Sequence, residues 1–207
     1  MKKLAFAALA AAALFVPSSA PGALVDIDVL DDEYAPQDAI FGFPADPGAR
    51  WTWGGFPGET TENEHTVTQN KKLFKSGAPK DTGDFEVNAS AGKYPYHCTV
   101  HGVSGMKGTL SILTGFAELD ADSVRVRWAT ANSTTGKRFD VRYRVDGGDF
   151  LIWQRNTRKL SKVFGRNDKP VEFDPAAHDY DFSARSVKGK PAKHKRSKWS
   201  PPTDPED

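Results

Sequence analysis

The sequence predicts an all-β chain divided into two consecutive units. Short runs rich in Val, Ile, Thr and aromatic residues recur between clusters of Gly, Pro, Asn and Asp, a pattern typical of strands joined by turns. No segment shows the sustained three-to-four-residue spacing of apolar positions that an amphipathic helix requires. A chain of 207 residues can hold two units of ordinary size.

The N-terminal segment 1–23 has the pattern of a secretory signal peptide, with cleavage expected near 20–23. Lys2 and Lys3 precede an uninterrupted apolar run from Leu4 to Val16, and small residues follow it. A bilayer-spanning helix needs about 20 apolar residues, so this 13-residue run is too short to span. We therefore expect an exported protein, periplasmic or extracellular, that does not span a membrane.

The first unit is placed at 24–114 and is acidic. Between Leu24 and Leu113 there are 7 Lys and Arg against 13 Asp and Glu, a net charge of −6. The strands predicted in it are Val25–Leu30, Arg50–Trp53, Glu64–Thr68, Gly83–Val87, Gly92–Cys98 and Gly108–Leu113. The glycine-rich stretch 54–58 is expected to be a loop.

The second unit is placed at 115–202 and is basic. From Thr114 to the end of the chain, 19 Lys and Arg stand against 14 Asp and Glu, a net charge of +5. Strict alternation of apolar and cationic residues predicts half-buried strands. The strands predicted are Ser123–Trp128, Arg138–Val145, Phe150–Gln154, one at Val163, Val171–Phe173 and Tyr180–Arg185. The tail, 203–207, is expected to be disordered because it is rich in Pro and charged residues.

Residues with metal-binding side chains cluster near the end of the first unit. Cys98 is the only cysteine of the chain, His101 follows after two intervening residues, and Met106 is one of only two methionines. A thiolate, imidazoles and a weak axial thioether are the ligands that select copper for electron transfer. Export strengthens this interpretation, because a single cysteine cannot form an internal disulfide and a metal would occupy the thiol.

The second imidazole is expected from His65, which begins a predicted strand behind a flexible loop. His97 adjoins Cys98 and should point to the opposite face of the sheet, while His178 and His194 belong to the second unit. A structural zinc site is the main rival to copper, but zinc would require more Cys and His ligands and no methionine.

The first unit resembles the cupredoxins, in particular the plastocyanin, pseudoazurin and halocyanin branch of these blue copper proteins. The resemblance rests on Pro47-Gly48, on Glu64–Val67, on Leu73–Gly77, and on Gly92–Cys98 followed by the Cys-x₂-His-x₄-Met spacing. It implies a Greek-key β-sandwich with one type 1 copper held by His65, Cys98, His101 and Met106. One departure from the family is Thr66, because many relatives have Asn at that position, where it fixes the ligand loop.

The second unit resembles a fibronectin type III module, an immunoglobulin-like β-sandwich. Trp128 occupies the position of the core Trp on an early strand, and Tyr180–Ser186 resembles the strand with the tyrosine corner. Trp199-Ser200-Pro201 resembles the closing strand. Modules of this kind act as spacers or contact surfaces, and the unit contains no catalytic grouping.

These expectations define an exported one-electron carrier rather than an enzyme, because full ligation leaves no open position for a substrate. The resemblance implies a copper cofactor cycling between Cu(I) and Cu(II). We expect a redox partner protein whose identity the sequence does not give, no nucleic acid, and a monomeric chain. The alternatives are a copper-delivery protein, or an accessory subunit whose fibronectin-like module docks a partner.

Overall fold

The computed structural model describes residues 24–42, 48–102, 105–166 and 172–205. The predicted signal peptide lies outside the described residues. The fold is all-β, with two hydrophobic cores, and the only helical element among the described residues is a 3-10 turn, η1 (Pro191–Lys193). No described helix is long and apolar enough to cross a membrane.

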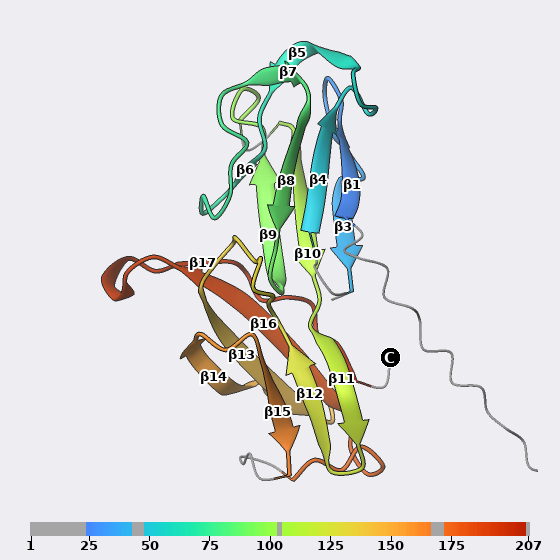
Figure 1. The fold of residues 1–207 in the computed structure, drawn as a ribbon, viewed down its shortest axis with the longest axis vertical. Helices are drawn as coiled ribbons and strands as arrows, with labels where there is room; N and C mark the ends of the chain where they lie inside the picture. The colour runs from blue at the N-terminus through green and yellow to red at the C-terminus, as the bar shows by residue number, and fades with distance from the viewer. Residues whose placement is uncertain (1–23, 43–47, 103–104, 167–171, 206–207) are drawn as a thin grey trace, which may run out of the picture.

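The first unit is a sandwich of two four-stranded sheets with a small hairpin-like pair at one end (Figure 1). One sheet has the order β2-β1-β4-β8, the other β3-β10-β9-β6, and β5 pairs with β7. The strands are β1 (Leu24–Val29), β2 (Tyr34–Ala35), β3 (Asp38–Phe41), β4 (Gly48–Trp53), β5 (Thr60–His65), β6 (Thr68–Gln69), β7 (Lys80–Thr82), β8 (Asp84–Asn88), β9 (Gly92–His97) and β10 (Lys107–Ile112).

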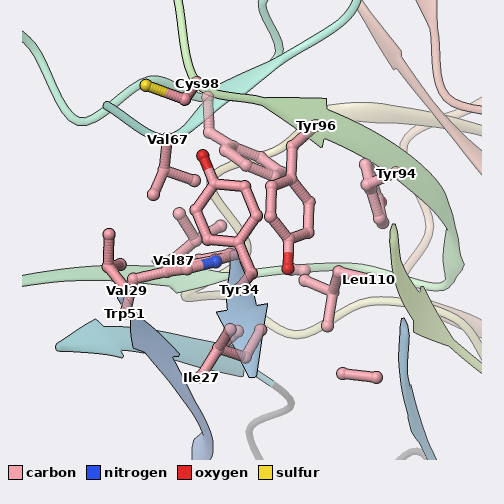
Figure 2. Packing of buried hydrophobic residues seen from close by; sticks show 14 of the residues in the cluster. Ile27, Val29, Tyr34, Trp51, Val67, Val87, Tyr94, Tyr96, Cys98 and Leu110 are labelled. Carbon is pink, nitrogen blue, oxygen red and sulfur yellow. The ribbon is translucent and has the colours of Figure 1, made fainter. Parts of the chain in front are cut away.

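Aromatic residues fill the space between these two sheets. Trp51 is fully buried, and its ring meets that of Tyr96 edge-on with centroids 5.3 Å apart. Tyr34 packs against Tyr96 in the same way at 4.8 Å. Figure 2 shows Cys98 at the margin of this cluster, with its sulfur directed away from the tyrosine rings. The core therefore fixes the backbone that carries the thiol.

The second unit is a sandwich of a three-stranded sheet, β11-β12-β15, and a four-stranded sheet, β14-β13-β16-β17. Trp128 is fully buried in its core. The Tyr180 hydroxyl donates to the Glu172 carbonyl at 3.1 Å, a bond to backbone a few residues upstream that is typical of a tyrosine corner. The strands are β11 (Gly115–Asp120), β12 (Ser123–Arg127), β13 (Arg138–Val145), β14 (Leu151–Thr157), β15 (Ser161–Gly165), β16 (Tyr180–Lys188) and β17 (Lys195–Arg196).

Three sequence predictions are wrong. The single strand predicted at Glu64–Thr68 is divided into β5 and β6, because the Thr66 amide donates to Cys98 Sγ and the Val67 amide donates to Ser76 Oγ instead of to a neighbouring strand. Within the predicted strand Val171–Phe173, Val171 lies outside the described residues and Phe173 is buried but not in a strand. The disorder predicted from residue 203 is wrong for Thr203, because its amide and carbonyl both bond to Phe182.

The two units are joined by a buried cluster of hydroxyl groups as well as by the chain between β10 and β11. Ser90 and Tyr94 of the first unit contact Thr135 and Ser186 of the second. The Tyr94 hydroxyl lies 2.7 Å from Ser186 Oγ, and Ser90 Oγ lies 2.9 Å from Thr135 Oγ1. Satisfied buried polar networks of this kind fix one arrangement of the packed surfaces. In Figure 1 the second unit meets the end of the first sandwich opposite β5 and β7.

Candidate metal centre

One thiol and two imidazoles converge at the end of the first sandwich that carries β5 and β7. The candidate ligand atoms of His65, Cys98 and His101 all lie within 4.8 Å of one another. His65 Nδ1 is 3.9 Å from Cys98 Sγ, and the two imidazole rings have centroids 5.0 Å apart. Two ligands bound at about 2.0–2.3 Å to the same ion can be at most about 4.6 Å apart, so the 3.9 Å separation fits one shared metal.

The three residues come from two places in the chain. His65 ends β5, whereas Cys98 follows β9 and His101 lies in the loop from β9 to β10. That loop is closed by a hydrogen bond from the Cys98 amide to the Met106 carbonyl at 2.9 Å. Gly102 has φ 73°, a conformation that a glycine adopts without strain, and its carbonyl accepts from the Gly105 amide at 3.3 Å.

Thr66 holds the two ligand segments together. Its amide donates to Cys98 Sγ at 3.4 Å, and its hydroxyl accepts a hydrogen bond from the Thr99 amide at 2.8 Å. The Tyr34 hydroxyl in turn donates to the Thr66 carbonyl at 2.6 Å. Many relatives of the family that the first unit resembles have Asn at this position to fix the ligand loop. Here the Thr66 hydroxyl bonds to that loop instead.

Burial differs sharply among the three ligand candidates. Cys98 and His65 are fully buried, whereas His101 is exposed. Burial lowers the pKa of His65, and repulsion from His101 lowers it further, although Asp31 opposes both effects. An imidazole kept neutral is the form that binds a metal.

His65 Nε2 faces a carboxylate on the far side from the thiol. It lies 3.7 Å from Asp31 Oδ1, and among the described residues this buried nitrogen has no hydrogen-bond partner. Asp31 Oδ1 also accepts a hydrogen bond from the Asn63 amide at 3.1 Å. A carboxylate beside the distal nitrogen is a common means of orienting a metal-bound imidazole.

Met106 is buried and directly precedes β10, and its sulfur is the remaining sequence-predicted ligand.

The other histidines are elsewhere. His97 Nδ1 lies 2.9 Å from Asn70 Oδ1, and His178 Nδ1 lies 2.8 Å from Asp146 Oδ2. Asp31 was not predicted as part of the site. It lies in the turn after β1, and no local sequence pattern indicates that this turn lies beside His65.

No protein-family model matches the sequence, and no curated protein matches it. Among solved structures, pseudoazurin from Hyphomicrobium denitrificans is similar at 17% identity, covering 44% of this chain and 75% of that one, with a TM-score of 0.31. Plastocyanin from Dryopteris crassirhizoma is similar at 18% identity over 42% of this chain and 99% of that one, with a TM-score of 0.29.

A segment of two fibronectin type III domains from chicken tenascin is also similar. The identity is 16%, the match covers 78% of this chain and 92% of that one, and the TM-score is 0.29. Each of these is a likeness of fold. By its own strand order and its two cores, the chain fits a cupredoxin-like β-sandwich followed by a fibronectin type III-like module.

Proposed function

We propose that the protein is an exported one-electron carrier that binds a single copper ion through His65, Cys98 and His101, with Met106 as a weak axial ligand. The observation that carries the proposal is the convergence of one buried thiol and two imidazoles within 4.8 Å. This donor set, together with the thioether that we propose as its fourth ligand, is the one that selects copper for electron transfer. A bound copper ion would supply the one-electron chemistry.

The chain's own residues hold the sulfur of Cys98 in place. The Thr66 amide donates a hydrogen bond to this sulfur at 3.4 Å. Cys98 directly follows β9, and the side chains of Tyr94 and Tyr96 in that strand are buried in the core. A ligand fixed in this way cannot move far when the charge at the site changes, which favours fast electron transfer.

His101 gives the site its contact with solvent. It is exposed, and the adjacent Val100 has 53% of its surface accessible. The other two ligand candidates are enclosed by protein. Electrons would therefore pass between the site and a partner protein through the imidazole of His101. The second unit is docked at the other end of the sandwich and leaves this face open (Figure 1).

The test is to load the purified mature chain with Cu(II) and record its visible absorption and voltammetry. An electron carrier is expected to be intensely blue, to give a reversible one-electron wave, and to retain copper against a competing chelator through repeated redox cycles. Cys98→Ser should lose the colour while remaining folded, and His178→Ala, at an exposed position of the second unit, should keep it. A colourless adduct or an irreversible wave contradicts the proposal, and ready release of copper to the chelator favours copper delivery.

A further inference from the structure

A pocket with a cationic lining lies in the second unit, beside its junction with the first. Its volume is about 530 Å³. The cationic residues that line it are Lys137, Arg138, Arg158 and Lys188, and no acidic residue of the described part of the chain lines it. Ligand pockets in proteins commonly have volumes of about 300–1,000 Å³, so this one is large enough for a small organic molecule.

The four cations come from three separate segments that the fold brings together. Lys137 and Arg138 stand at the start of β13, Arg158 follows β14, and Lys188 ends β16. Three of them are held by backbone carbonyls: Lys137 Nζ donates to Ser133 at 3.2 Å, Arg138 to Asn156 at 3.1 Å, and Lys188 Nζ to Leu73 at 2.9 Å. These bonds position the cations without neutralising their charge.

The absence of carboxylates around these cations contrasts with the rest of the second unit. Arg144 pairs with Asp181 at 2.7 Å, and Arg166 pairs with Asp122 at 2.8 Å. Arg185 bonds to the buried Asp140 at 2.8 Å. Within the described ranges, none of the four pocket cations has a carboxylate within ion-pair distance. The described part of the unit therefore pairs other cations with acids and places no acid at this pocket.

Four like charges around one concave surface repel one another, and an anion in the pocket would relieve that repulsion. A single tetrahedral oxyanion would fill little of the volume and neutralise only part of the charge. Arg in particular binds phosphate and sulfate oxygens through paired N–H donors. We propose that this pocket binds a small polyanion that carries two or more phosphate or sulfate groups.

The pocket is separate from the metal centre but is connected to the first unit. Lys188, at the end of β16, donates to Leu73 in the first sandwich, so one wall of the pocket is tied to that unit. The proposal does not rest on copper binding or on electron transfer. It can fail while the copper proposal holds, and the reverse is also possible.

The test is isothermal titration of the full mature chain with four probes in 100 mM NaCl. Inorganic tripolyphosphate represents phosphate esters, and sucrose octasulfate represents sulfated ligands. Inorganic phosphate represents a single oxyanion, and a glutamate-rich peptide represents an acidic protein. At least one of the two polyanions is expected to bind one molecule per chain, with at least tenfold higher affinity than inorganic phosphate. Which of the two binds more tightly identifies the ligand's anionic group.

Charge-reversal variants locate the site. Arg158→Glu and Lys137→Glu are each expected to weaken polyanion binding at least tenfold, because both side chains are exposed lining residues. Arg155→Glu makes the same change at an exposed position of β14 that does not line the pocket, and should alter binding less than twofold. At 0.1 M salt the screening length is about 10 Å, so remote charges contribute little.

Several outcomes overturn the proposal. The first is that neither polyanion binds. The second is that Arg155→Glu weakens polyanion binding as much as the two pocket variants do. The third is that inorganic phosphate binds with the same affinity as the polyanions. Binding of a glutamate-rich peptide without either polyanion also overturns it, because the surface would then be one for an acidic protein. Circular dichroism of each variant confirms that a loss of binding is not a loss of fold.

Discussion

The amide of Thr66 and the sulfur of Cys98 are 3.4 Å apart, although 32 positions separate the two residues in the chain. This contact joins the end of β5 to the end of β9 and so assembles the candidate metal centre from two strands. The hydroxyl of Thr66 adds a second link, because it accepts from the Thr99 amide at 2.8 Å. One buried residue therefore braces both sides of the site.

Replacing Thr66 by Val is expected to destabilise the metal-free protein. Val has nearly the shape of Thr but cannot accept from the Thr99 amide, and an unpaired buried donor costs about 1–3 kcal/mol. Thr66→Ser keeps the hydroxyl and should retain more of the stability. Urea denaturation of the two metal-free variants gives the comparison, and equal free energies of unfolding would show that this hydroxyl bond contributes nothing.

Copper should stabilise the folded chain through His101. With free copper a thousandfold above its dissociation constant, binding adds about 4 kcal/mol to the free energy of unfolding. His101→Ala is expected to remove most of that gain, while the exposed position changes the metal-free stability by no more than about 0.5 kcal/mol. His178→Ala, an exposed histidine of the second unit, is the control and should keep the full copper effect. Thermal unfolding with and without copper measures all three.

The junction cluster is expected to make the two units unfold together. Tyr94→Phe deletes the hydroxyl that lies 2.7 Å from Ser186 Oγ and donates to the Ser90 carbonyl at 2.7 Å. The buried polar groups that lose their hydrogen-bond partner should lower the free energy of unfolding by about 1–3 kcal/mol. The unfolding transition measured by calorimetry should then broaden or split into two. Tyr34→Phe removes a buried hydrogen bond within the first unit only and should lower stability without splitting the transition. Two transitions in the unmodified protein would contradict the coupling.

Asp140 should make the stability of the second unit depend on pH. Burial by itself would raise its pKa, but the Asn156 amide together with Arg185 and Arg196 outweighs burial and holds the pKa below its usual value of 3.8. A carboxyl with a lower pKa in the folded state adds stability above its unfolded pKa of about 3.9, and that stability is lost as the pH falls through the folded pKa. The effect of Asp140 should therefore be present at pH 7 and lost in acid.

Asp140→Asn tests this pH dependence. Its side chain is 3% exposed and bonds to Arg185 at 2.8 Å, while the Arg185 side chain itself is 25% exposed, so the loss at pH 7 is expected to be about 1–3 kcal/mol. The difference from the unmodified protein should shrink as the pH is lowered below 4. Asp149→Asn, at an exposed position, serves as the control. Urea denaturation at pH 7 and at low pH measures the difference, and a loss that is the same at both would contradict the ionic role.

The short loop from Cys98 to Met106 could be predicted because its chemistry is local. A thiol, an imidazole and a thioether at close spacing indicate a candidate metal site wherever the loop lies in space, and the strand before it has a clear alternating pattern. His65 could be predicted from its place at the start of an expected strand, from the family resemblance and by eliminating the other histidines. Its approach to 3.9 Å from the sulfur depends on β5 and β7 pairing, which joins segments with weak strand patterns.

The sequence by itself determined the all-β class, the two units and the residue types of the candidate metal centre, because periodicity and ligand chemistry are written in neighbouring residues. The tertiary structure decided the rest. Thr66 bonds to Cys98 and Thr99, Asp31 stands beside His65, Thr203 pairs with β16, and four cations line one pocket. Each of these depends on contacts between residues distant in the chain, and such contacts are set by how the sheets pack rather than by any local pattern.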